Sequence, residues 1–140
     1  MKNLIKTFAV LFLLITYSCK AQQMVQTPND AIKLKINEQQ FINKPLKNLL
    51  AQIKPEIKMA FGTLEMPSYF SFRFITSEEL KQKVKGRKLI GLYVYVKEDI
   101  KEWNNGTRPK EKEFIWTKED LEKYGNYTVV RIKVIERIED

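Results

Sequence analysis

The chain of 140 residues contains no histidine. This absence excludes the Ser-His-Asp and Cys-His catalytic groups, and it excludes the common zinc sites that use histidine. Catalysis by carboxylates or by a Ser/Lys pair stays open. However, Glu78 and Glu79 stand where acidic residues favour the start of a helix, and no serine has a lysine at a spacing that indicates a dyad. We therefore predict no catalytic residue, and a hydrolase or lyase that uses carboxylates or a Ser/Lys pair is the alternative.

Glycine and cysteine are also scarce. The five glycines are scattered, so no glycine-rich phosphate loop is present, and no D-x-D-x-D-G calcium loop occurs either. We expect no cofactor and no metal ion. Cys19 is the only cysteine, and a single thiol cannot form a disulfide framework within the chain.

Long apolar runs are missing as well. The unbroken apolar segment over 8–15 is too short to cross a hydrocarbon core, which requires roughly 20 helical residues. Two positive charges, Lys2 and Lys6, precede this segment, and no acidic residue does. This layout is typical of a removable export signal.

The signal ends in Ser18-Cys19, and this ending resembles the lipobox of bacterial lipoproteins. The resemblance covers about twenty residues and departs from the usual pattern at Thr16 and Tyr17. It implies that the Cys19 thiol receives a diacylglycerol, that the chain is cut before Cys19, and that the new amino group is acylated. The alternative is an ordinary signal peptide with a cysteine there by chance.

The resemblance also implies where the protein lies, and it implies that a membrane is the first partner, through the lipid on Cys19. Several acyl chains on one residue give stable membrane anchoring. Lys20 follows Cys19, where an inner-membrane retention signal would have aspartate. We therefore expect a protein of the cell envelope. Its location is expected to be the outer membrane in preference to the inner one, with its domain in the periplasm or at the surface.

Composition divides the chain into three parts. Residues 1–18 form the predicted signal, and 19–30 form the lipidated cysteine and a polar tether rich in Gln, Asn and Thr. Residues 31–140 have the length of one domain.

Alternating apolar residues predict about five strands in this domain. They are expected over 32–36, 57–61, 69–75, 88–97 and 130–134, with a further short strand over 114–116. Leucines after Pro45 predict a helix up to Ile53, and Thr76 and Thr117 begin capping sequences of two more helices. The mixture predicts an α+β fold with a mostly antiparallel sheet and two or three helices on one face.

An excess of basic residues is the second functional signal. The chain carries 25 Lys and Arg against 17 Asp and Glu, a net charge of +8, which falls to +6 without Lys2 and Lys6. If apolar positions face the helices, basic side chains point away from them; these are Lys33, Lys35, Lys58, Arg73, Lys97, Arg131 and Lys133. Tyr93 and Tyr95 are expected among them.

This arrangement predicts a ligand-binding face composed of Arg73, Tyr93, Tyr95, Arg131 and Lys133. Such a face suits an anionic glycan, a lipid phosphate or an acidic protein of the envelope. The simpler explanation is that long charged side chains keep an open sheet soluble. Nucleic acid is not an expected partner of an exported protein. The sequence therefore favours a membrane-anchored, non-enzymatic binding or accessory lipoprotein.

Overall fold

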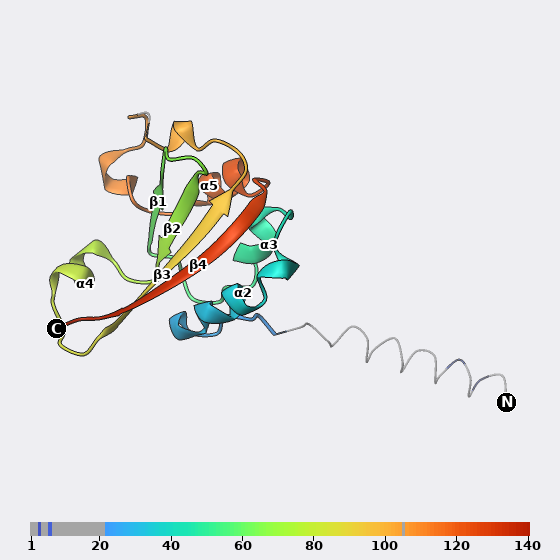
Figure 1. Ribbon diagram of the computed structural model, residues 1–140, viewed down its shortest axis with the longest axis horizontal. Coiled ribbons are helices and arrows are strands. Elements are labelled where there is room, and N and C mark those ends of the chain that lie inside the picture. Colours follow the sequence, from blue (N-terminus) through green and yellow to red (C-terminus); the bar gives the residue numbers. More distant parts are fainter. Residues whose placement is uncertain (1–2, 4–5, 7–21, 105) are drawn as a thin grey trace.

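The computed structural model describes residues 3, 6, 22–104 and 106–140. Cys19 and the predicted signal, apart from Asn3 and Lys6, lie outside these residues. None of the helices in the described part of the chain is long and apolar enough to cross a membrane. The fold is α+β, with one open antiparallel sheet and short helices around it (Figure 1).

The sheet has four strands in the order β1-β2-β3-β4, all antiparallel to their neighbours. The strands are β1 (Met59–Gly62), β2 (Tyr69–Arg73), β3 (Lys88–Val96) and β4 (Val129–Ile138). The predicted count of about five is therefore wrong by one, because the first predicted strand is helical. The predicted short strand over 114–116 is also absent; there, the Ala60 N–H donates to the Phe114 carbonyl at 2.8 Å, but no strand forms.

The segment Ile32–Ile36, predicted as a strand, is the helix α2. Its start explains the difference. The Asp30 carboxylate accepts a hydrogen bond from the Thr27 N–H at 3.1 Å and fixes the 3₁₀ turn η1 (Pro28–Ala31), which continues directly into α2. Only Leu34 of the three apolar residues is fully buried, whereas Ile36 is 74% exposed. The helix-start signal outweighs an alternation that fits either structure.

The predicted tether also differs from the structure. Within its described part, Val25 is fully buried and forms a bridge with Ile53. The Val25 N–H donates to the Gln52 carbonyl at 2.9 Å, and the Val25 carbonyl accepts from the Lys54 N–H at 2.9 Å. The folded part therefore begins before the predicted boundary at residue 31.

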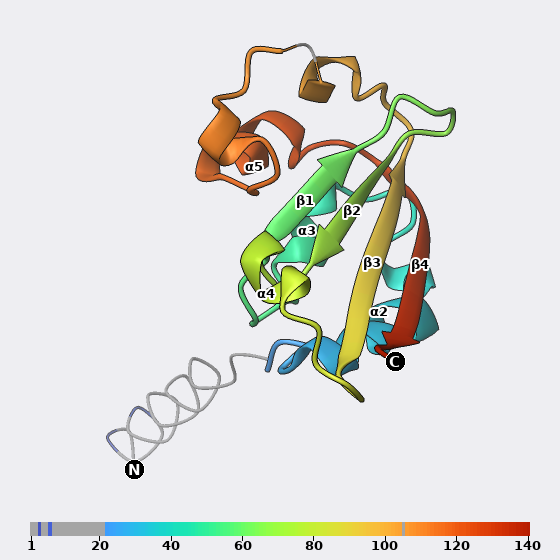
Figure 2. The same ribbon diagram turned by 90° about the vertical axis from the view of Figure 1, so that its left-hand side faces the viewer.

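The remaining helical segments surround the sheet. They are η2 (Glu38–Gln40), α3 (Leu46–Leu50), α4 (Ser77–Lys81), η3 (Lys101–Asn104), η4 (Lys110–Lys112) and α5 (Lys118–Tyr124). Both predicted capping boxes are confirmed: the Thr76 side chain accepts from the Glu79 N–H at 3.0 Å, and that of Thr117 accepts from the Asp120 N–H at 3.2 Å. Figure 2 shows α2 and α3 behind the sheet, with α4 near one end of the strands.

The core lies between one sheet face and the helices. Its strand and helix residues include Phe70, Phe72, Leu92, Val94, Ile132, Leu34, Leu46, Leu49 and Tyr124. Burial of Phe72 and Val94 confirms the predicted register of β2 and β3. In β4 the expected alternation fails at one point, because a bulge opposite Tyr95 and Val96 leaves Val130 exposed and buries Val129 instead.

Candidate functional site

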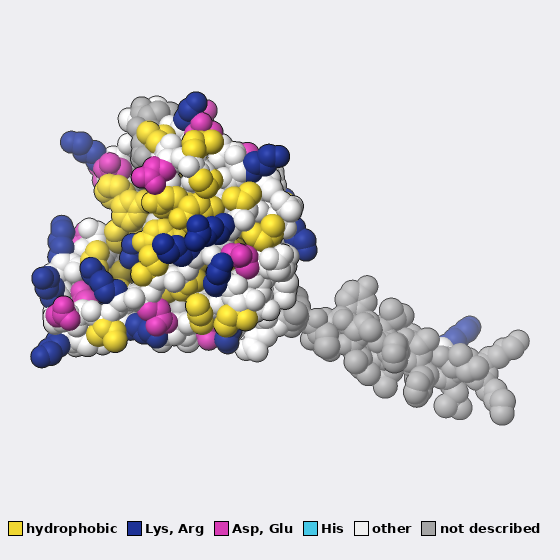
Figure 3. Space-filling model, in the orientation of Figure 1, with side chains coloured by type: hydrophobic (Ala, Val, Ile, Leu, Met, Phe, Trp, Pro, Cys, Tyr) yellow, Lys and Arg dark blue, Asp and Glu magenta, His cyan; other side chains and the backbone are white. Residues whose placement is uncertain are grey.

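The sheet face opposite the core collects the five residues predicted to bind a ligand. Tyr95 pairs with Arg131, and Tyr93 pairs with Lys133 on β4 and Ser71 on β2. Arg73 lies two residues beyond Ser71, on the same side of the strand. We call this side of the sheet the outer face. Figure 3 shows hydrophobic side chains gathered on one face of the molecule, with Lys and Arg side chains lying across them.

Arginine and tyrosine side chains contact one another on the outer face. An Arg73 Nη donates to the Tyr93 hydroxyl at 2.8 Å, and the guanidinium carbon lies 5.6 Å from the ring centre. Arg131 lies over the Tyr95 ring at 5.2 Å. Both distances are in the range of cation–π contacts, which hold the guanidinium groups close to the sheet surface.

Tyr69 completes a tyrosine cluster that the sequence did not assign to the site. Its ring centre lies 5.0 Å from that of Tyr95 and 5.8 Å from that of Tyr93. Burial, together with the nearby Glu65 carboxylate, raises the pKa of Tyr69 above its ordinary value, so the phenol stays neutral at physiological pH. The sequence did contain a signal for this position of Tyr69. In β2, Tyr69 alternates with the core residues Phe70 and Phe72, so its side chain lies on the opposite face of the strand.

Gly91 provides the space in which Arg73 lies. A Cβ added to Gly91 would stand 3.2 Å from the Arg73 guanidinium carbon and 3.0 Å from a Tyr93 ring carbon. Both contacts are tighter than ordinary van der Waals separation. Because glycine has no side chain, the Arg73 guanidinium can lie close to β3 beside the tyrosine.

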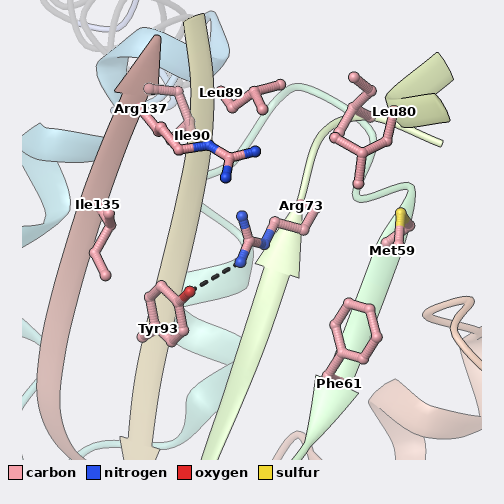
Figure 4. Close-up of a pocket in the computed structure, with 10 residues that line it drawn as sticks. Met59, Phe61, Arg73, Leu80, Leu89, Ile90, Tyr93, Ile135 and Arg137 are labelled. Atoms are coloured by element: carbon pink, nitrogen blue, oxygen red, sulfur yellow. Dashed lines mark hydrogen bonds between the residues drawn. The ribbon is translucent and has the colours of Figure 1, made fainter. Parts of the chain in front are cut away.

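A pocket of about 360 Å³ opens at one end of the outer face. Two arginines, Arg73 and Arg137, line it together with Tyr93. Figure 4 shows both guanidinium groups pointing toward one another across β3. The apolar part of the lining comes from β1, β3, β4 and the α4 region; it includes Met59, Phe61, Ile75, Leu80, Leu89 and Ile135.

The pocket separates the predicted residues into two groups. Arg73 and Tyr93 line it, whereas Tyr95, Arg131 and Lys133 lie outside it on the same face. Arg137 was not predicted as a site residue. Its signal was the continued alternation of β4, in which Arg137 follows Lys133 by two pleats.

Three of the other basic residues do not belong to the outer face in the predicted way. Lys33 and Lys35 lie on α2, where they form ion pairs with Asp30 at 3.0 Å and Glu38 at 2.8 Å. The prediction for these two followed from reading α2 as a strand, so it is wrong. The alternation predicted over 57–61 is also wrong in direction, because Ala60 joins the core whereas Met59 and Phe61 line the pocket on the outer face. Lys58, next to Met59, is paired with Glu79 at 3.3 Å.

The acidic residues beside the pocket are already paired. A backbone hydrogen bond from Thr76 and the contact with Lys58 lower the pKa of Glu79. A hydrogen bond from Arg87, at 2.6 Å, lowers the pKa of Glu139. Arg73 and Arg137 make no ion pair within the part of the chain that the structure describes.

The acid and serine side chains considered for catalysis do not meet in the pocket. Glu79 caps α4, Ser68 is 1% exposed, and Ser71 is 5% exposed with no hydrogen-bond partner for its hydroxyl among the described residues. No group of three Cys, Asp or Glu side chains in the described segments is placed to hold a metal ion. The outer face thus combines a row of arginine, lysine and tyrosine side chains with a basic, partly apolar pocket at one end.

No family model, curated protein or solved structure matches this chain.

Proposed function

We propose that the protein is an exported lipoprotein, anchored to a membrane through Cys19, whose domain binds an anionic envelope component without catalysis. The observation that carries this proposal is the outer face itself. Three basic side chains, Arg73, Arg131 and Lys133, share it without an ion pair among the described residues, and the two arginines contact tyrosine rings.

The chemistry of these residues fits an anion. Arginine donates two parallel hydrogen bonds to a phosphate or carboxylate, and a tyrosine ring offers an apolar surface with a hydroxyl at low entropic cost. A face designed only for solubility would have no need to place its guanidinium groups against aromatic rings. Lipid phosphates, anionic glycans and acidic proteins are the ligand classes that this chemistry accommodates.

Anchoring is tested by replacing Cys19 with alanine. The variant is expected to incorporate no labelled palmitate and to remain uncut or be released from the membrane, because the acylated atom is the Cys19 sulfur. The measurement is metabolic labelling of bacteria that express each form, followed by membrane fractionation. Ser18→Ala, which keeps the thiol, is the control. An unlabelled wild-type protein, or a mature N-terminus at any residue other than Cys19, would contradict anchoring.

Binding by the outer face is tested with Arg73, Arg131 and Lys133 changed together to glutamine. In a soluble form of residues 22–140, which retains Val25, we expect this triple variant to lose at least tenfold in affinity for its anionic target. Binding of the unchanged form should weaken between low and physiological salt, because exposed charges are screened. Co-sedimentation with anionic lipid vesicles, lipopolysaccharide and peptidoglycan is the measurement.

A variant with the same loss of charge is the matched control. Lys110, Lys112 and Lys118 are exposed and lie in η4 and at the start of α5, so their change to glutamine removes three charges elsewhere. It should bind within about twofold of the unchanged form. Equal losses of affinity in the two triple variants would show that only net charge matters. Binding that changes with neither salt nor substitution would contradict a role of the outer face.

A further inference from the structure

We infer that the pocket between Arg73 and Arg137 binds one anionic membrane lipid, with the headgroup on the two guanidinium groups and the beginning of an acyl chain on the apolar walls. The inference deepens the proposed function and rests on it, because it names the ligand of the same face. Two features carry the inference: a pair of arginines that forms no ion pair among the described residues and lines a partly apolar pocket, and the position of the chain that leads to Cys19.

The two arginines create a demand for an anion. Their guanidinium groups come from strands on either side of β3 and point toward one another, and the Tyr93 hydroxyl accepts from Arg73 at 2.8 Å (Figure 4). Arg137 is exposed and Arg73 is half-buried, so water screens part of the repulsion between the two charges, and an anion that bridges them would be attracted by both. Glu139 is near Arg137 but accepts hydrogen bonds from the Arg87 Nε at 2.6 Å and the Val84 N–H at 3.3 Å. The described part of the domain thus leaves this role to a ligand.

The walls select an anion that carries an apolar group. Leu80 is 37% exposed and Ile135 is 41% exposed, and both line the pocket. Met59 and Leu89 also line the pocket and are almost fully buried. A volume of about 360 Å³ is within the range of small-molecule pockets and too small for a folded partner. A hydrophilic anion such as inorganic phosphate would leave these apolar side chains in water.

The position of the N-terminal segment identifies the membrane as the source of the ligand. Pro28 of η1 lines a hollow together with Leu89 and Ile90, and the same two residues line the pocket. The continuously described chain begins six residues before Pro28, behind the sheet and near this end of the strands, where Val25 pairs with Ile53 (Figure 2). An anchor at Cys19 would therefore keep this end of the sheet nearer the lipid surface than the opposite end.

The test uses the full-length acylated protein, purified in a nonionic detergent and titrated by calorimetry against a blank of detergent alone. Dodecyl phosphate and dodecanoate are the probes, since one carries a phosphate and the other the carboxylate of a free fatty acid. Dodecanol and inorganic phosphate each lack one half of the proposed ligand. We expect at least one of the two anionic probes to bind, and at least tenfold more tightly than either comparison compound. The stronger of the two identifies the headgroup class.

Single substitutions locate the site. Arg73→Gln and Arg137→Gln should each lower affinity about tenfold. Arg131→Gln, with the same loss of charge on the same face but outside the pocket, should change it less than twofold. Leu80→Ser should weaken dodecyl phosphate more than ethyl phosphate. Circular dichroism and melting temperatures establish that each variant is folded.

Three results would overturn the inference. They are the absence of binding by both anionic probes, equal losses in Arg131→Gln and Arg137→Gln, and tighter binding of an apolar peptide with a free carboxylate than of either amphiphile. If the first occurs while anionic vesicles still bind through Arg73, Arg131 and Lys133, the pocket inference fails and the proposed function stands. If vesicle binding also fails, both fail.

Discussion

Replacing Phe72 with alanine is expected to lower the free energy of unfolding by about 3–5 kcal/mol. Phe72 is fully buried in β2, and its ring lies 5.9 Å from Phe70 and 5.1 Å from Trp116, edge to face. Alanine would leave a cavity between the sheet and the helices that short strands cannot fill. A loss of this size is a large part of the stability of a small domain.

Ser71→Ala is the neighbouring control. Ser71 lies on the outer face, as predicted, but it is only 5% exposed and its hydroxyl has no partner among the described residues. Removing an unsatisfied buried hydroxyl should leave stability unchanged or raise it slightly. Chemical denaturation of both variants measures the difference. Comparable losses for Ser71→Ala and Phe72→Ala would show that the register of β2 is wrong.

The second large effect concerns the ion pair that fixes the segment before α5. Two Arg108 nitrogens donate to the Asp120 carboxylate, at 2.6 and 3.0 Å. Arg108 also stacks on the Trp103 ring at 3.8 Å. The side chains of Asp120 and Arg108 are 6% and 16% exposed, respectively. Removing one partner of a buried pair strands the other charge, so Asp120→Asn should cost about 3–5 kcal/mol.

This pair also predicts a dependence on pH. Burial opposes ionisation of Asp120, but hydrogen bonds from Arg108 and Thr117 outweigh it and hold the pKa below the ordinary value. A group with a lowered folded-state pKa contributes its full stability above the unfolded-state value, near 4. That contribution is lost as pH falls through the folded-state pKa.

Stability measured between pH 7 and pH 2 checks this prediction. The difference in free energy of unfolding between the unchanged protein and Asp120→Asn should be constant near neutral pH and should become smaller in acid. Glu122→Gln, an exposed substitution in the same helix, should leave the stability curve close to that of the unchanged protein. If this difference in free energy of unfolding were still as large at pH 2, the loss of stability would be due to the shape of the side chain and not to its charge.

Local sequence signals predicted most of the fold. The alternation of Phe70 with Phe72 and of Leu92 with Val94 identified two strands and the face that each buries. The capping sequences at Thr76 and Thr117 located the starts of α4 and α5, because such caps act within one turn of helix. The error at residues 32–36 arose because five residues are too few to distinguish the two-residue period of a strand from the 3.6-residue period of a helix.

The site was harder to predict because it depends on contacts between strands. Alternation placed Arg73, Tyr93 and Arg131 on one face, and the register of the sheet is consistent with that. It carried no information on which arginines approach each other. Arg137 points toward Arg73 across β3, although it lies 64 positions later in the chain. The absence of a side chain at Gly91, which makes room for Arg73 beside Tyr93, has meaning only once the strands are paired.

Burial of Val25 has a consequence for how an anchored protein would meet its ligand. Only five residues separate Cys19 from Val25, so this connecting segment spans about 20 Å at full extension. This is less than the diameter of a domain of about 100 residues, roughly 34 Å for a sphere with a radius of gyration of about 13 Å. The domain would thus be confined to a thin layer next to the bilayer, where the effective concentration of lipid headgroups is far higher than in the surrounding water. In that layer a site of modest affinity for such headgroups would stay occupied.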